Sequence, residues 1–502
     1  MVRRMHFIVA LIMTLIGFAS LPAAAQSGRI FYIDYASGSN TNNGTSKNTP
    51  WKTHPYMQTG ASCTGTGSAP SYTHAAGDQF IFKGGVTWPA ACFGMNVTSG
   101  GSSASLTDYY GVDKTWYAGG SWAMPIFDLA GQAPTSVGPS GAYNVIYVSR
   151  SASYTVWDAL EMKGQFVVGG HSGPSDGWDC GIYFSVAGTS TVKNGYFHDW
   201  VTDTANLNAG FSNCAGGISR ALLVTGMTFS DQGGTPVPFG GCSFNSNEVA
   251  NSVCHHVAQG VLGWGGNVHD NKFYGFTNAC CVAPYTNGIH TNVIEQTYTG
   301  TGIFYNNLIH DNSAAVTMLV GCTASIYNNV LWNNYQDIVI DTDSVTCPNP
   351  STDTAYVYNN TVDCSNGFNC FKVGYRGVTL GTLNLKNNHW ITNGTAVCYN
   401  NTGAGCSNVT AVNASNNLTM TTATAASQGY TSANLYEPTA STNATVDAAV
   451  SLSGLCSGNL GSLCADRLHY TRGTSWDTGA YEFGGQSSST PNAPLSLTAM
   501  VQ

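Results

Sequence analysis

The sequence predicts an all-β fold in which short strands stack into a coil. A phrase of tyrosine, two asparagines and apolar residues recurs in residues 305–310, 327–332 and 358–363. Weaker copies occur at 195–197, 226–229, 246–249, 269–273, 386–390 and 415–418. The shortest spacings are about 22 residues, enough for three short strands and their turns. The longer spacings indicate loops inserted into the same unit.

The repeated segments read as strands because residues 301–305 and 324–327 alternate and are rich in β-branched and aromatic side chains. Helical repeats of similar period lack this alternation. Asparagine suits a corner because it tolerates a left-handed backbone and its amide can bond to the same amide one rung away. Turn composition alone would not place apolar residues at fixed offsets on both sides. We therefore predict an asparagine ladder.

Residues 1–25 resemble a secretory signal of the bacterial type. Arg3 and Arg4 give the positive start, residues 7–18 are apolar, and residues 23–25 are three alanines. The apolar run is too short to favour a membrane span, and no later run is longer. The sequence therefore predicts a secreted, extracellular protein without an integral membrane segment.

The charge balance argues against a nucleic-acid partner. Without Arg3 and Arg4 the chain keeps 15 basic side chains against 26 acidic ones, a formal charge of about −11. No basic tract is available to hold phosphate backbones.

All 16 cysteines lie beyond residue 25, and export predicts disulfides among them. Short separations suggest Cys364 with Cys370, Cys398 with Cys406, and Cys456 with Cys464. A zinc site is the alternative for residues 254–256 and 280–281, but neither shows paired ligand spacing. No metal site is predicted.

The opening at residues 29–83, the Asn-Asn rungs and the closing residues 476–483 together resemble the pectate-lyase-like superfamily of right-handed parallel β-helix proteins. The resemblance covers nearly the whole chain after residue 25. It implies a single-stranded β-helix with three strands per rung and about ten rungs. The expected parts are residues 26–140 as N-terminal cap and first strands, 141–420 as β-helix, 421–486 as C-terminal cap, and 487–502 as a flexible tail.

In that superfamily the asparagine turn joins the second and third strands of a rung. First strands are then expected at 181–184, 217–220, 261–264, 288–291, 315–318 and 338–341. Alternation predicts that Ile182, Ile218, Leu262, Ile289 and Val316 face the interior, and that Tyr183, Ser219, His290 and Thr317 face outward.

The resemblance also implies a polysaccharide groove along the outward first strands. Projected onto this chain, the groove passes His255, His256, Trp264, His290, Glu295, Asp337 and Asp341. Groups on about three successive rungs could lie within about 10 Å of one another, which suits the two carboxyl groups of a glycoside hydrolase. We expect Glu295 to pair with Asp337 or Asp341. The alternative is that these acids are structural or solvated.

Further candidates surround this pair. His290 is a candidate catalytic residue, and the Trp264 ring on the preceding rung could stack on a sugar. His256 and Tyr183 are candidate substrate contacts, as is a second cluster of His171, Asp176 and Asp179. Two His-Asp pairs, at residues 198–199 and 310–311, occupy equivalent turns and are interpreted as polar groups of the corners. His269 aligns with Tyr305, Tyr327 and Tyr358, which predicts a stack of rings.

The hydrolase subfamily that cleaves polygalacturonate has an adjacent acidic pair, Gly-His-Gly and Arg-x-Lys, and this chain matches only in part, at residues 288–290. A lyase needs cations to neutralise a uronate and a base to take its α-proton. No Lys or Arg occurs between Lys272 and Lys372. Calcium is the only cofactor considered, and a neutral glycan is favoured.

Two functions follow. The first is an exported protein that cleaves a polysaccharide, by hydrolysis rather than elimination. The alternative is a non-catalytic surface or matrix protein whose rigid rod binds carbohydrate or adheres to cells; a depolymerase within a larger assembly is a weaker third. Fold alone does not choose between them.

Overall fold

The chain is described from a computed structural model. The residues that it describes are 28–168, 179–202, 214, 216–231, 240–263, 265–276, 292–296, 300–313, 316–342, 347, 349, 351–366, 368–374, 379–400 and 405–485.

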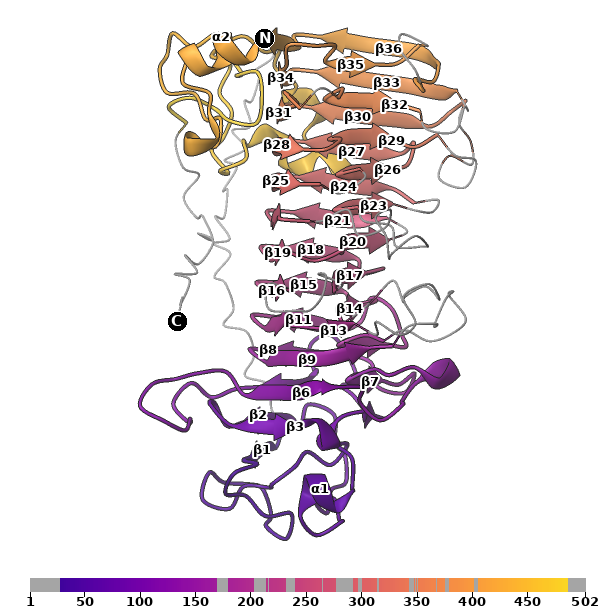
Figure 1. Cartoon of the computed structure of the whole chain (residues 1–502), viewed down its shortest axis with the longest axis vertical. Helices are drawn as coiled ribbons and strands as arrows, with labels where there is room; N and C mark the ends of the chain where they lie inside the picture. The colour runs from indigo at the N-terminus through magenta and orange to yellow at the C-terminus, as the bar shows by residue number, and fades with distance from the viewer. Residues whose placement is uncertain are drawn as a thin grey trace, which may run out of the picture.

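Three parallel sheets wrap one axis, and each rung of the coil adds one strand to each sheet in turn (Figure 1). All pairings between the named strands are parallel, and every sheet grows by one rung at a time. This is a parallel β-helix with three strands per rung, as predicted. Over the described residues its sheets contain 11, 13 and 13 strands, more than the ten rungs expected, because residues 28–140 already supply strands to all three.

Sheet 1 holds the strands expected to come first in each rung. In spatial order these are β4 (Met95–Val97), β7 (Ile146–Val148), β10 (Ile182–Phe184), β14 (Ile218–Ser219), β17 (Gly241–Phe244), β20 (Gln259–Gly263), β23 (Ile294–Gln296), β26 (Met318–Val320), β29 (Ile338–Ile340), β32 (Phe371–Val373) and β35 (Val397–Cys398).

Sheet 2 holds the strands that precede the asparagine corner. They are β1 (Ile30–Ile33), β2 (Gln79–Phe82), β5 (Asp108–Gly111), β8 (Thr155–Asp158), β11 (Thr191–Lys193), β15 (Leu223–Thr225), β18 (Glu248–Ala250), β21 (Gly266–His269), β24 (Gly302–Tyr305), β27 (Ala324–Tyr327), β30 (Thr354–Tyr358), β33 (Leu380–Lys386) and β36 (Val409–Ser415).

Sheet 3 follows that corner. Its strands are β3 (Thr87–Pro89), β6 (Ile126–Gln132), β9 (Glu161–Val167), β12 (Tyr196–His198), β16 (Thr228–Ser230), β19 (Val253–His255), β22 (Lys272–Tyr274), β25 (Leu308–Asn312), β28 (Val330–Asn334), β31 (Thr361–Asp363), β34 (His389–Ile391) and β37 (Leu418–Met420), with β13 (Val201–Thr202) beside β9.

The helices are short. They are α1 (Ala61–Thr64), α2 (Thr422–Ser427) and the 3-10 turns η1 (Ala90–Cys92), η2 (Pro139–Gly141), η4 (Ser432–Asn434), η5 (Ser453–Leu455) and η6 (Gly458–Cys464). Within the described ranges, none has the length and hydropathy of a membrane span.

At the corner between sheets 2 and 3, the two asparagines of each pair have different roles. The first residue of each pair, as at Asn306, Asn328 and Asn359, has a left-handed backbone with φ between 51° and 57°. The second asparagine of each pair donates its side-chain N–H to the side-chain oxygen of the second asparagine on the next rung, at 2.8 to 3.1 Å. This ladder runs through Asn271, Asn307, Asn329, Asn360, Asn388 and Asn417. The prediction of stacked amides is confirmed.

Aromatic columns follow the outer faces in the same way. The rings of His269, Tyr305 and Tyr327 stack within 5° of parallel, at 4.6 and 4.9 Å between centroids. These are three of the four rings predicted for this column; the fourth, Tyr358, is in register with Tyr327, and its ring lies at 63° to that of Tyr356. A second column on sheet 3 contains His255, Tyr274, His310 and Trp332.

At the corners, each histidine forms a hydrogen bond with the aspartate that follows it in the sequence. His198 and Asp199 lie 2.8 Å apart, and His310 and Asp311 lie 2.7 Å apart. Each aspartate has a left-handed backbone, at φ 55° and 56°. Both pairs therefore occupy corner positions, as interpreted from the sequence.

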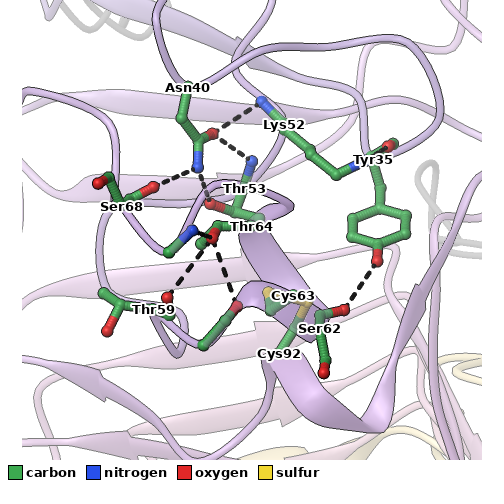
Figure 2. The surroundings of a disulfide bond; sticks show 12 residues. Tyr35, Asn40, Lys52, Thr53, Thr59, Ser62, Cys63, Thr64, Ser68 and Cys92 are labelled. Carbon is green, nitrogen blue, oxygen red and sulfur yellow. Dashed lines mark hydrogen bonds between the residues drawn. A yellow bond between two sulfur atoms is a disulfide. The ribbon is translucent and has the colours of Figure 1, made fainter.

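The N-terminal end is held by a disulfide and by a half-buried hydrogen-bond network around one asparagine side chain (Figure 2). Cys63 in α1 is bonded to Cys92 in η1. The Asn40 side chain accepts from the backbone of Lys52 and Thr53 and donates to Ser68 and Thr53. These contacts fix the loops beyond the first rung.

The C-terminal segment, residues 421–485, lies along the side of the coil beside the last strands (Figure 1). It bonds to the outward residues of the asparagine corner. The contacts are Asn416 to Ala448 O, Asn387 to Val450, Asn359 to Asp477 O, Asn328 to Ala465 O, and Asp270 to His469. The segment therefore spans several rungs of this corner.

Seven disulfides join described cysteines. They are Cys63–Cys92, Cys180–Cys214, Cys242–Cys254, Cys322–Cys347, Cys364–Cys370, Cys398–Cys406 and Cys456–Cys464. The three pairs predicted from short separations are confirmed. This number of disulfides is consistent with an extracellular protein.

Candidate functional site

The outer face of sheet 1 carries one column of residues in continuous register, which we call the outer row. Its eleven members are Asn96, Tyr147, Tyr183, Ser219, Phe244, Leu262, Glu295, Leu319, Val339, Lys372 and Cys398. The neighbouring column, which includes Ile182, Ile218 and Ile294, packs into the core inside the coil. The inward positions of Ile182 and Ile218 and the outward positions of Tyr183 and Ser219 are as predicted.

Two residues predicted to face the interior lie outside it. Leu262 packs with Tyr183 and Phe244, and Val316 packs with Leu319 and Val339, in two small clusters apart from the main core. At Leu262 the prediction was wrong because Val261 and Leu262 are both apolar, so alternation does not set the register there. Val316 shares its phase with Met318 but precedes β26, so the alternation of that strand does not extend to it. Val261 and Met318 are the residues that fill the interior.

The outer row is covered over much of its length. Tyr183, Phe244 and Leu262 are 4 to 6% exposed, and Val339 is fully buried. Two aromatic members, Tyr147 and Tyr183, stack at 5.8 Å between ring centroids, and Arg220 donates to the Tyr183 hydroxyl at 3.2 Å. The described part of this face is therefore a packed surface and not an open groove.

Glu295 is the acid of the outer row. It lies in the middle of β23, in register with Leu262 on one side and Leu319 on the other. Its side chain is 5% exposed, and Oε2 accepts from the Asn292 amide at 2.5 Å. Burying a carboxyl group between leucines costs free energy, so packing alone does not explain this residue.

Asp337 ends a second, shorter amide ladder at the corner between sheets 3 and 1. Asn312 donates to Asn334 at 2.9 Å, and Asn334 donates to Asp337 Oδ1 at 2.9 Å. Burial raises the pKa of Asp337 to about 8, although the Asn334 hydrogen bond acts the other way. The carboxyl group therefore holds its proton at neutral pH.

Asp341 follows the opposite end of β29 and is 4% exposed. Its backbone carbonyl oxygen lies 3.9 and 3.0 Å from the sulfur atoms of Cys322 and Cys347, which form one disulfide. Asp337 and Asp341 thus flank the three residues of β29.

The histidine pair lies on sheet 3 and its following corner, away from the outer row. His255 and His256 approach through their Nδ1 atoms at 2.8 Å, and His256 has a left-handed backbone. Burial, with His256 and Lys272 nearby, lowers the pKa of His255 to about 4. Cys254 is bonded to Cys242, which removes it as a thiolate ligand. Within the described ranges, no group of three such side chains is placed to hold a metal ion.

Asp179 is buried at the start of the sheet 1 rung that contains Tyr183. Its two carboxylate oxygens accept from the backbone of Tyr143 and Val168 at 2.9 and 3.1 Å. It fixes the chain entering β10. His290, Trp264, Asp176, His171 and Ile289 lie outside the described residues.

Sequence reasoning missed an exposed pair of aromatic rings at the corner between sheets 3 and 1. Tyr335 and Phe368 are 47% and 41% exposed, with ring centroids 4.6 Å apart. The available signal was Asn333-Asn334 beside Tyr335, a second Asn-Asn pair within one rung that marks a second corner.

No family model and no curated protein sequence matches the chain. Among solved structures, it is similar to GH136 lacto-N-biosidase from Eubacterium ramulus, with 12% identity and a TM-score of 0.47 over 78% of this chain and 68% of that one. A rhamnogalacturonan lyase gives 14% identity and a TM-score of 0.39, over 78% and 87% of the two chains. Pectate lyase Pel9A gives 15% identity and 0.38, over 92% and 98%. These neighbours are carbohydrate-active enzymes, and at this similarity no residue role is transferred from them.

Proposed function

We propose that this chain is an exported carbohydrate-active protein that binds a polysaccharide on the sheet 1 side of the coil and cleaves it with Glu295. The observation that supports this is the single carboxyl group of the outer row, placed between Leu262 and Leu319. Buried acids that packing does not require are candidates for acid–base chemistry.

Asp341 is proposed as the second carboxyl group. The outer-row residue of its strand, Val339, lies two rungs from Glu295, roughly 10 Å along the axis, and Asp341 lies two residues beyond it. Inverting hydrolysis places two carboxyl groups about 6.5–9.5 Å apart with a water between them, so the side chains of Glu295 and Asp341 would have to extend toward each other across these rungs. Asp337 is assigned a structural role, because it terminates the amide ladder of Asn312 and Asn334 at the corner between sheets 3 and 1.

Hydrolysis is favoured over elimination. Glu295 and Asp341 supply acids, while residues 273–371 contain no Lys or Arg to neutralise a uronate. Elimination would need calcium to take that role.

The second candidate is a non-catalytic rod that binds carbohydrate. It is favoured by the burial of the outer row, since Glu295 is 5% exposed and Val339 is fully covered. A polymer could then contact the outer surface of the coil without reaching an acid.

The deciding experiment incubates the secreted protein with neutral and acidic polysaccharides, with and without calcium. Reducing ends report hydrolysis, and ultraviolet absorbance reports unsaturated products. We expect reducing ends from a neutral polymer, lost in Glu295→Gln and in Asp341→Asn and kept in Asp337→Asn. Glu248→Gln on the outer face of sheet 2 is the matched control, because Glu248 bonds His269 far from the outer row.

Binding without products on every polymer would favour the rod. Full activity in Glu295→Gln would remove Glu295 from the reaction.

A further inference from the structure

We propose that Tyr335 and Phe368 form a binding platform for the pyranose rings of a neutral glycan. The two rings are the exposed aromatic pair at the corner between sheets 3 and 1. Aromatic side chains that stay exposed beside one another are suited to stack on the apolar faces of sugar rings. This inference does not depend on cleavage by Glu295.

The geometry gives a ledge of two rings on adjacent rungs. Tyr335 precedes β29 and Phe368 precedes β32, and these strands pair directly in sheet 1. The ring planes are tilted by 49° at 4.6 Å, so the rings do not cover one another face to face as in the interior columns. Each ring therefore keeps surface for a ligand.

Amide groups surround the ledge. Asn366 donates to the carbonyl oxygen of Asn334 at 2.9 Å, and Asn369 donates to that of Thr395 at 2.8 Å. The side-chain oxygens of Asn366 and Asn369 accept no hydrogen bond from the described residues. Sugar hydroxyl groups can donate to such oxygens. The surface thus combines apolar rings with fixed amides.

The charges near the ledge select against an anionic polymer. Asp311 lies one rung away and is bonded by Asn333 at 2.6 Å, and Asp363 ends the strand that leads to Phe368. The sequence from residue 273 to residue 371 has no Lys or Arg. Lys372 in β32 is the basic side chain that follows Phe368, so a uronate chain would meet the carboxylates of Asp311 and Asp363 with this one cation to offset them, whereas a neutral glycan would meet no like charge.

The ledge is placed to continue the outer row. β29 lies two strands from β23, so Tyr335 is roughly 10 Å along the axis from Glu295. Tyr335 is 47% exposed whereas Glu295 is 5% exposed, so a glycan held on the ledge would lie at the surface, about two rungs from Glu295.

The test is affinity electrophoresis of the full secreted chain with Glu295→Gln, which prevents cleavage during the run. The gels contain mixed-linkage β-glucan, arabinoxylan, galactomannan or polygalacturonate. We expect slower migration in at least one neutral gel and less retardation by polygalacturonate. Tyr335→Ala or Phe368→Ala should weaken binding roughly fivefold each, the factor expected for one lost stacking contact. Tyr335→Phe and Phe368→Tyr should keep it.

Tyr117→Ala is the control, because Tyr117 is 37% exposed in the N-terminal part of the coil, far from the ledge. Thermal melting checks that all variants fold. The proposal is overturned if no neutral gel retards the protein, or if polygalacturonate retards it more than the neutral polymers do. It is also overturned if the double alanine variant binds as tightly as its parent, or if Tyr117→Ala loses as much binding as the ledge variants. Cleavage of polymers by the chain with native Glu295 is measured separately, so its absence would affect the proposed function alone.

Discussion

The guanidinium group of Arg472 donates to the side-chain oxygen of Asn328 at 3.2 Å, which joins positions 144 residues apart. The same guanidinium bonds Glu482 at 3.1 Å and the carbonyl oxygen of Gly479 at 3.0 Å. Arg472 is thus the central contact between the C-terminal segment and the asparagine corner.

Arg472→Ala is expected to destabilise the protein by about 3–5 kcal/mol, because the Glu482 carboxylate would lose its cation in a largely buried site and keep, among the described residues, only the backbone N–H groups of Gly473 and Asp477 as donors. Urea unfolding measures the change. Arg150→Ala removes the same charge from an exposed turn and should shift the free energy of unfolding by less than about 0.5 kcal/mol. Equal effects of the two substitutions would contradict the central role of Arg472.

Asn329→Ala should cost about 1–3 kcal/mol, since it removes the acceptor of Asn307 and the donor to Asn360 within a buried ladder. Asn413→Ala is the control, because Asn413 bonds Asn384 on an exposed face. Urea midpoints at equal slope report the difference. A ladder position no more sensitive than Asn413 would show that the stacked amides add little.

Asp337→Asn is expected to stabilise the protein at neutral pH. Burial raises the pKa of Asp337 to about 8, above the ordinary value of 3.8, so the folded state keeps a proton that the unfolded chain loses. The stability of the native protein therefore falls as pH rises from about 4 to about 8. The asparagine variant should lack this decline and gain on the order of 2–4 kcal/mol by pH 8. Parallel pH profiles of the two proteins would rule out the raised pKa.

His389→Gln should reduce the loss of stability in acid. Burial lowers the pKa of His389 from 6.5 to about 3, so below pH 6.5 the unfolded chain takes up a proton that the folded chain refuses. Stability should fall by about 1.4 kcal/mol per pH unit from this residue between pH 6.5 and 3. Thermal melting from pH 7 to 4 measures the slope. The slope should be shallower in the variant, and an unchanged slope would show that His389 does not titrate as described.

The asparagine ladder could be predicted because its signal is repeated in the sequence as it is in space. Asn307, Asn329 and Asn360 recur with the same neighbours in the sequence, so the conformation expected for one rung applies to the next. The interior phase of sheet 1 could not be assigned at Val261 and Leu262, where both neighbours are apolar and only the packed structure decides.

The remaining contacts are not periodic. Nothing near Arg472 in the sequence points to Asn328, and nothing beside Tyr335 points to Phe368 on the next rung. The outward position of Tyr183 followed from alternation, whereas the roles of Glu295, Asp341 and His290 stay predictions, because function depends on chemistry that a strand pattern does not encode.

The C-terminal segment has a consequence for how the coil comes apart. A stack whose rungs touch only their neighbours can fray from its end one layer at a time. Here the segment ties corner positions from Asp270 to Asn416 to one strap. Peeling the last layer requires the strap to detach, so this end of the rod is expected to open as a single cooperative block.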